Sequence, residues 1–210
     1  MKLYDMRLAP NPRRVRMFLA EKNLDIPKVE VSVVEGENLK PDFRNINYRG
    51  LLPTLELDDG TCLDESVAIC RYIEELQPEP NLLGRDALEK ARIESWQRHM
   101  EFDGFWPLAD FFRNTFPAFA ERAVPGLAEK FQAIPELAER GRRRYEIFLD
   151  GFNHRLKDNE FVAGDRFTIA DITAFVAADW GRRMKLPIPE RHAHSSRWYA
   201  AVSRRPSAGA

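Results

Sequence analysis

The stretch RGLLPTLELDDGTCLDESVAICRYIEE, residues 49–75, combines a proline, two strand patterns, a hairpin turn and the start of a helix. Leu55 and Leu57 alternate with polar residues, which is typical of a strand with one buried face. The turn sequence DDG at 58–60 signals a hairpin, so residues 61–63 are expected to return as the partner strand. Apolar residues then recur at helical spacing: Ile69, Cys70, Ile73 and Leu76. The stretch therefore predicts strand, strand and helix in that order.

The sequence before this stretch alternates strand and helix patterns. Residues 2–6 have the pattern of a strand, and residues 15–19 place three apolar side chains on one helical face. Valines alternate with polar residues over 29–33, as in a half-buried strand. Residues 36–44 are polar and only weakly helical. The predicted order is β-α-β-α-β-β-α, an α/β domain.

The stretch QPEPNLLGRD, residues 77–86, holds three helix breakers close together, and the strand signal stops there. Only helical patterns follow, and they show no repeat. The sequence therefore predicts an α/β domain over 1–78, a linker over 79–87 and an all-helical bundle over 88–210.

One helix start in the second half has a strong local signal. In VAGDRFTIADITAF, residues 162–175, Thr168 stands three residues before Asp171 and ahead of an apolar run. This spacing predicts a capping box, in which each residue bonds the backbone N–H of the other. We assign these two residues a structural role and no catalytic one.

Composition excludes several classes of protein. The net charge is −1 and the pI about 6.5, which argues against nucleic-acid binding. No apolar run approaches the ~20 residues that cross a bilayer, and no signal peptide precedes the first strand pattern. Cys62 and Cys70 form no CxxC pair and lie in buried patterns, so we expect unreactive thiols. The histidines have no metal-binding spacing. We expect a cytoplasmic protein without a metal, a nucleic-acid partner or a membrane partner.

Four motifs together resemble the glutathione S-transferase family. They are RRVRMFLAEKN at 13–23, GENLKPDFRNIN at 36–47, the stretch at 49–75 and FVAGDRFTIADITAF at 161–175. The resemblance is to the atypical Gtt-like fungal and bacterial members, which lack the usual catalytic serine, cysteine or tyrosine. It implies a thioredoxin-like domain followed by a helical domain that forms the electrophile pocket. It also implies glutathione as co-substrate and a homodimer.

The resemblance implies that the peptide bond between Leu52 and Pro53 is cis, so that the Leu52 backbone pairs with glutathione as an added strand. Glu65 and Ser66, at a predicted helix start, would take the ammonium and the carboxylate of the γ-glutamyl group. The alternatives are an ordinary proline at a strand entry, and a serine that merely caps the helix with Asp64.

The glycine end of glutathione has two candidate partners. Lys40 matches a family position that often meets the glycine carboxylate, although it could equally be a solvated surface lysine. Asn38 stands where several classes have a histidine. Arg49, just before the turn that leads to the proline, could therefore serve as the carboxylate partner.

The usual catalytic side chains are missing from the first helix start. In the serine and cysteine classes that residue would fall at Ala9, which has no side-chain donor. In the tyrosine classes the phenol comes from the first strand. Tyr4 is one place off that register, and strand alternation turns it to the opposite face. We therefore expect Tyr4 to lie in the core.

The helix start itself remains as the source of catalytic donors. Asn11 is predicted as the N-cap and Pro12 as the first helical residue. The catalytic candidates are the Asn11 amide and the backbone N–H groups of Ala9 and Arg13. In the rival interpretation, capping occupies the Asn11 amide. Lowering a thiol pKa by about two units needs ~2.7 kcal/mol. A helix N-terminus supplies ~0.3–2 kcal/mol and one charge-assisted hydrogen bond roughly 1.5–3 kcal/mol, so together they suffice.

An aromatic stretch of the second half is the candidate pocket for the electrophile. Phe112 and Phe116 share one helical face, and we include Asn114 in the same pocket. A water held by Arg113, Asn114 or Thr115 is a further candidate donor to the thiol.

These features predict a glutathione transferase that conjugates the thiolate to small apolar electrophiles. Two alternatives stay open. The same thiolate could reduce a disulfide or a peroxide, or the chain could be a non-catalytic member of the fold that binds a protein partner through its helical domain. Ala9 favours the last alternative, whereas Glu65 and Ser66 argue against it.

Overall fold

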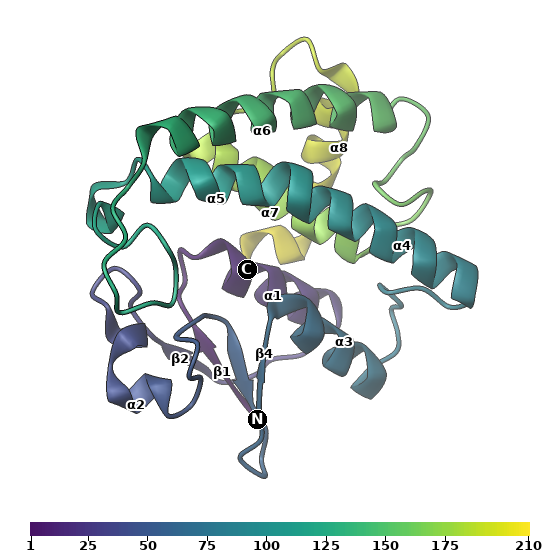
Figure 1. The fold of residues 1–210 in the computed structure, drawn as a ribbon. Helices are drawn as coiled ribbons and strands as arrows, with labels where there is room; N and C mark the ends of the chain where they lie inside the picture. Colours follow the sequence, from purple (N-terminus) through teal and green to yellow (C-terminus); the bar gives the residue numbers. More distant parts are fainter.

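The computed structural model describes residues 1–210 and shows a small sheet domain below a larger set of helices (Figure 1). The sheet has the strand order β2-β1-β3-β4; β2 is parallel to β1, and the other pairs are antiparallel. Its elements are β1 (Lys2–Asp5), α1 (Pro10–Glu21), β2 (Lys28–Glu30), a 3-10 turn (Glu37–Leu39), α2 (Pro41–Arg44), β3 (Thr54–Glu56), β4 (Cys62–Asp64) and α3 (Ser66–Leu76). The predicted order β-α-β-α-β-β-α is confirmed. The strand predicted over 29–33 as half-buried is shorter, Lys28–Glu30, and exposed, because it lies at the edge of the sheet and the chain leaves the sheet once the Val31 N–H has bonded the Asp5 carbonyl.

The second half is helical, as predicted, apart from loops, the longest of which covers residues 120–134 and contains an isolated β-bridge between Arg122 and Phe131. Its elements are α4 (Ala87–His99), a π-helical segment (Met100–Phe105), α5 (Trp106–Arg113), a 3-10 turn (Pro117–Phe119), α6 (Pro135–Arg155), α7 (Ile169–Arg183), α8 (Ala193–Ser203) and a 3-10 turn (Pro206–Gly209). In Figure 1, α4 and α5 form one long rod joined by the π-helical segment, and α6 runs beside it. The connection between the two halves has no helix or strand and lies between Leu76 and Ala87. No helix is long and apolar enough to cross a membrane.

One large hydrophobic core joins the two halves, and a second cluster of 4 buried residues, which includes Tyr4 and Leu52, lies within the first domain. Leu3 and Leu55 from the sheet and Phe152 from α6 belong to one cluster of 33 buried apolar residues. Helix α7 runs through the middle of it, with both its polar and apolar faces buried over most of its length. Because one core spans both domains, the relative position of sheet and helices is fixed by packing.

The predicted capping box at the start of α7 is present. The Asp171 carboxylate accepts hydrogen bonds from the Thr168 N–H at 3.0 Å, the Val162 N–H at 2.8 Å and the Trp198 indole N–H at 2.9 Å. Burial nevertheless raises the pKa of Asp171 to about 6. The residue thus ties the start of α7 to the preceding loop and to α8.

The two cysteines differ from each other. Cys70 is fully buried in α3, and burial raises the pKa of its thiol to about 12. Cys62, predicted to be buried, is exposed instead, because it lies on the edge strand β4. Burial of part of its thiol and the nearby Glu56 carboxylate raise the pKa of Cys62, so neither thiol is activated.

The start of α1 is tied to α7 by a buried ion pair. The Arg13 guanidinium donates to the Asp179 carboxylate and, at 2.9 Å, to the Ala208 carbonyl. Asp179 also accepts from Arg182, Arg183 and the Tyr199 hydroxyl. Burial opposes the ionisation of Asp179, but the hydrogen bonds from Arg13 and its other donors outweigh it and hold the pKa well below its usual 3.8.

We expect Asp179 to make stability pH-dependent in acid. A carboxyl whose pKa is depressed on folding stabilises the protein above its unfolded pKa of 3.8, and this contribution is lost as the pH falls. Urea unfolding of wild type and Asp179→Asn at about pH 6 and about pH 2.5 measures the effect. The wild-type advantage in free energy of unfolding should shrink on acidification. An advantage that is unchanged between the two pH values would contradict the assignment.

Candidate functional site

The sheet register brings the turn after β1 next to the turn before β3. Strand β1 pairs antiparallel with β3, with Tyr4 opposite Thr54. The residues after Asp5 therefore lie beside Leu52 and Pro53, which precede β3. The peptide bond between Leu52 and Pro53 is cis, as the family resemblance implied.

The Leu52 backbone is free for a ligand. Neither its N–H nor its carbonyl oxygen forms a hydrogen bond within the chain. A buried peptide group normally has a partner, and Leu52 is only 9% exposed. The free pair has the donor and acceptor arrangement that an extended peptide needs to add a strand.

Helix α1 begins earlier than the sequence predicted. Ala9, not Asn11, is the N-cap residue, and Pro10, not Pro12, is the first helical residue. Pro10 explains this start, because the fixed φ of a proline suits the first helical position. A proline also favours an extended backbone at the residue before it, and Ala9 has that conformation. The Asn11 side chain makes no capping bond, so the interpretation that capping occupies its amide is wrong.

The first turn of α1 leaves one N–H without an acceptor. The Ala9 N–H donates to the Met6 carbonyl at 2.9 Å, and the Arg13 N–H donates to the Ala9 carbonyl at 3.2 Å. The predicted backbone donors at Ala9 and Arg13 are therefore occupied, and the prolines between them have no N–H. The free donor is the backbone N–H of Asn11, which forms no hydrogen bond.

Tyr4 lies in the core, as predicted. It is 7% exposed, and its hydroxyl donates to the Glu56 carboxylate at 2.8 Å. Burial and the Glu56 hydrogen bond raise the pKa of this phenol. Tyr4 is therefore not available to ionise a thiol.

Glu65 and Ser66 lie at the start of α3, as predicted. Glu65 has a φ of 62°, an unfavourable conformation for a residue other than glycine, and such residues are enriched at ligand-binding sites. The Ser66 hydroxyl is buried and accepts a hydrogen bond from the Arg14 guanidinium at 3.1 Å. Because its oxygen accepts from Arg14, its hydrogen remains free to be donated to an anion beside the helix start.

Arg14 connects the two domains beneath this helix start. It is 2% exposed, and its guanidinium also donates to the Glu101 carboxylate at 2.5 Å and lies over the Phe105 ring at 4.8 Å. Arg13 and Arg14, both on the first turns of α1, are in buried ion pairs with Asp179 and Glu101. The partners lie more than 80 residues away, so no local pattern could reveal this role.

The two candidates for the glycine carboxylate differ in availability. Lys40 is exposed, and its side chain forms no hydrogen bond or ion pair. Arg49 is held by Glu65 at 2.5 Å and by Asp64 at 3.4 Å. The Asn38 amide donates to the Gly50 carbonyl at 2.7 Å and so fixes the turn before the cis proline. Lys40 is thus the available cation, and Arg49 orients Glu65.

Aromatic rings gather at the end of α5. Phe112 and Phe116 stack with ring centroids 5.0 Å apart, and both contact Phe119. Trp180 from α7 packs against Phe112 at 5.4 Å, a contact that sequence spacing gave no sign of. The Asn114 amide bonds the backbone of its neighbours, donating to the Asp110 carbonyl and accepting from the Ile134 N–H. Its role in this geometry is to end α5 rather than to face a ligand.

Comparisons with known proteins agree with this geometry. The family models for the N-terminal and C-terminal domains of glutathione S-transferases match residues 3–81 and 115–206. Glutathione S-transferase 2 of Saccharomyces cerevisiae is 35% identical over 99% of this chain and 87% of its own. The solved structure of Gtt2 from the same yeast has a TM-score of 0.90 at 34% identity, covering 100% of this chain and 99% of that one. A Gtt2-class enzyme of Vibrio parahaemolyticus has a TM-score of 0.83 at 32% identity, covering 99% and 94%. The chain therefore belongs to the glutathione S-transferase family and is similar to its Gtt2 members.

Proposed function

We propose that this protein conjugates the glutathione thiolate to small electrophiles with an apolar body. The observation that carries the proposal is the unpartnered Asn11 N–H at the start of α1, beside the unpartnered Leu52 peptide. The Leu52 backbone would pair with the cysteinyl part of glutathione, which brings the thiol to the start of α1. As in the family, the assembly would be a homodimer in the cytoplasm.

The other proposed binding groups match the charged groups at the two ends of glutathione. Ser66 donates its hydroxyl to the γ-glutamyl carboxylate, and Glu65, oriented by Arg49, accepts from the ammonium group. Lys40 pairs with the glycine carboxylate. The pyrrolidine ring of Pro53 keeps the Leu52 peptide turned outward. Each contact uses a group that the folded chain leaves able to donate or accept.

The Asn11 N–H would stabilise the thiolate with the positive end of α1. No acidic residue lies in the first turn to oppose this field. One charge-assisted hydrogen bond of roughly 1.5–3 kcal/mol plus a helix-terminus contribution of ~0.3–2 kcal/mol covers the ~2.7 kcal/mol that a shift of about two pKa units requires. The Asn11 side-chain amide, which has no partner, is a second donor of the same kind.

The reaction then needs no further protein acid or base. The thiol proton leaves to solvent, and the sulfur attacks the electrophilic carbon. In a substitution the C–S bond forms and the leaving group departs with its bonding pair. Phe112 and Phe116 would hold the apolar body of the electrophile.

Two substitutions at one position test which donor acts. Asn11→Ala removes the amide and keeps the backbone N–H, whereas Asn11→Pro removes both and is compatible with a first helical turn. We expect the pKa of bound glutathione to lie about two units below its free value in wild type. It should remain low in Asn11→Ala and rise by about one unit or more in Asn11→Pro.

An ultraviolet titration of the thiolate, bound and free, measures these shifts, with circular dichroism as a check on folding. Asn11→Ala serves as the matched control for Asn11→Pro. If both variants lose the shift equally, the side-chain amide is the donor. A bound thiol that keeps its free pKa in wild type would overturn the proposed mechanism.

A further inference from the structure

Arg113 at the end of α5 carries a positive charge with no carboxylate partner. Its guanidinium lies over the Phe119 ring at 4.2 Å, and one N–H donates to the Arg122 carbonyl at 3.3 Å. Arg13 and Arg14, which are also largely buried, each pair with a carboxylate. Arg113 has no acidic oxygen within the 4.0 Å that defines an ion pair.

The surroundings of Arg113 make its positive charge energetically unfavourable. Burial and the neighbouring Arg122 lower the pKa of the Arg113 guanidinium to about 10, so it stays charged at neutral pH. A partly buried cation without a counterion interacts more strongly with an anion that reaches it than a cation in bulk water does. Its remaining N–H groups form no hydrogen bond within the chain and are not sealed from solvent.

Arg113 lies at the edge of the aromatic cluster formed by Phe112, Phe116 and Phe119. Phe119 contacts both other rings, and the Arg113 guanidinium stacks on Phe119. A planar molecule on the exposed part of Phe116 would therefore be separated from this cation by the Phe119 ring alone. Arg122 also lies over the Phe119 ring, at 5.6 Å, but its guanidinium is occupied by backbone carbonyls. The apolar surface is therefore paired with one available cation, Arg113, and this pairing fits an aromatic ring that carries an acidic group.

The segment that holds these rings lies over the sheet domain. The Arg122 guanidinium donates to the carbonyls of Val33 and Val34, at 3.2 and 2.7 Å. Gly126 packs on the turn before the cis proline, so closely that an added Cβ would lie 2.3 Å from the Arg49 carbonyl oxygen. The aromatic cluster and Arg113 are thereby fixed on the side of the helical domain that faces the Leu52 turn.

We propose that Arg113 binds a carboxylate on the electrophile, so that the preferred second substrate is an aromatic acid rather than a purely apolar compound. This inference rests on the proposed transferase function and narrows its substrate class. The acidic group is assigned to the electrophile rather than to glutathione, because Lys40 is free for the glycine carboxylate, whereas Arg113 adjoins the aromatic rings.

A matched pair of substrates tests the inference. Para-chloro-meta-nitrobenzoate and its neutral carboxamide undergo the same reaction: the glutathione sulfur bonds the ring carbon, and chloride leaves with the electron pair of the broken C–Cl bond. Arg113→Gln should lower the ratio of kcat/KM for the acid to kcat/KM for the amide by about 10- to 100-fold, the range of one charge-assisted hydrogen bond. The intrinsic reactivities of the two chlorides cancel in this comparison.

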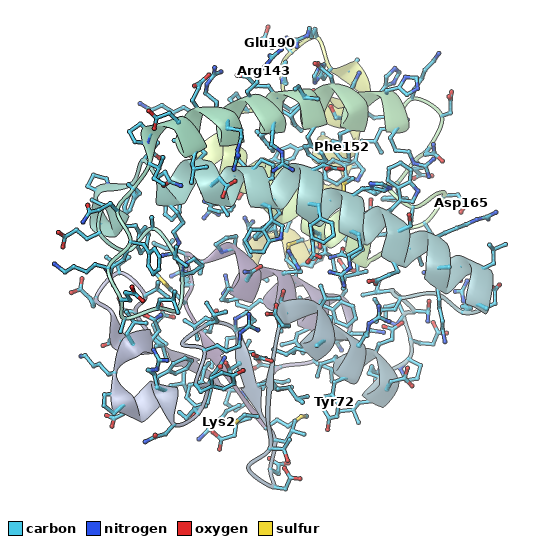
Figure 2. All side chains as sticks on the ribbon, viewed as in Figure 1. Lys2, Tyr72, Arg143, Phe152, Asp165 and Glu190 are labelled. Atoms are coloured by element: carbon cyan, nitrogen blue, oxygen red, sulfur yellow. The ribbon has the colours of Figure 1, made fainter.

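Arg143→Gln is the control with the same change of charge. Arg143 lies on α6, on the side of the molecule away from the sheet (Figure 2), and its only ion pair is an exposed one with Glu146 at 3.3 Å. It should leave the ratio unchanged. Arg113→Lys keeps the charge without the planar stack, and we expect an intermediate ratio. Arg113→Lys also replaces Arg113→Gln as the test variant if Arg113→Gln does not fold.

The remaining outcomes separate this inference from the transferase proposal. Turnover of both chlorides with an unchanged ratio in Arg113→Gln overturns the carboxylate site and leaves the transferase standing. A rise confined to the KM of glutathione assigns Arg113 to glutathione itself and overturns the inference too.

If neither chloride is turned over, the transferase proposal fails. Quenching of tryptophan fluorescence, with Trp180 beside Phe112, then decides the site. The acid should bind more tightly than the amide in wild type, and this preference should be absent in Arg113→Gln. Equal binding of acid and amide in wild type overturns the inference.

Discussion

Replacing Asp171 by asparagine is expected to lower the free energy of unfolding by about 2 kcal/mol. The two carboxylate oxygens accept from two backbone N–H groups, at Val162 and Thr168, and from the Trp198 indole. An asparagine keeps one acceptor oxygen and places an NH₂ group where the other oxygen was, which leaves at least one buried donor, such as the Thr168 N–H, unsatisfied at about 1–3 kcal/mol. The start of α7 would then lose its ties to the preceding loop and to α8.

Urea unfolding at a pH well above 6 measures this loss, because Asp171 is then ionised in wild type. Asp165→Asn is the matched control. Asp165 lies on the exposed loop after α6 (Figure 2) and forms no hydrogen bond or ion pair. Its substitution should change the free energy of unfolding by less than about 0.5 kcal/mol. Equal effects of the two substitutions would show that the carboxylate of Asp171 contributes nothing beyond its charge.

Replacing Arg14 by methionine is expected to weaken glutathione binding about tenfold or more and to destabilise the protein by about 3 kcal/mol. The stability is lost because the Glu101 carboxylate keeps only its contact with Arg98. The binding is lost because Ser66 no longer has a donor to fix the direction of its hydroxyl. A methionine keeps an unbranched apolar stem but removes the guanidinium that lies over the Phe105 ring.

Calorimetric titration with glutathione and urea unfolding give the two quantities separately. Arg13→Met is the control, since it also removes a buried guanidinium but breaks the contact with Asp179 rather than one with Ser66. It should cost stability with little change in glutathione affinity. If Arg14→Met is destabilised but binds glutathione as wild type does, Arg14 has only a structural role.

Local patterns predicted most of the fold. The hairpin at 58–60, the helix breakers at 77–86 and the capping box at Thr168 each depend on residues within a few positions of one another. These local conformational preferences already act in the unfolded chain, so they can be predicted directly from the sequence. The start of α1 was misplaced because two prolines, at 10 and 12, are both compatible with the first turn.

The part of the candidate site that lies in the first domain could be predicted from the sequence. The sequence motifs placed Leu52, Pro53, Glu65 and Ser66 together through the family resemblance, and the sheet register accounts for their proximity to the start of α1. The free donor was harder to predict. Whether the N–H of Ala9 or that of Asn11 remains unpaired depends on which carbonyl the turn brings near, and the three-dimensional path of the chain decides that.

The sequence by itself determined the order of the elements, the two domains and the motifs of the family. Only the tertiary structure decided that Arg14 supports Ser66, that Trp180 joins the aromatic cluster and that Arg113 is left without a counterion. The physical reason is the separation along the chain between the residues that interact. Turns, caps and periodicity are set by neighbours in the chain, whereas charge pairing and ring packing depend on helices that meet only when one core closes around both domains.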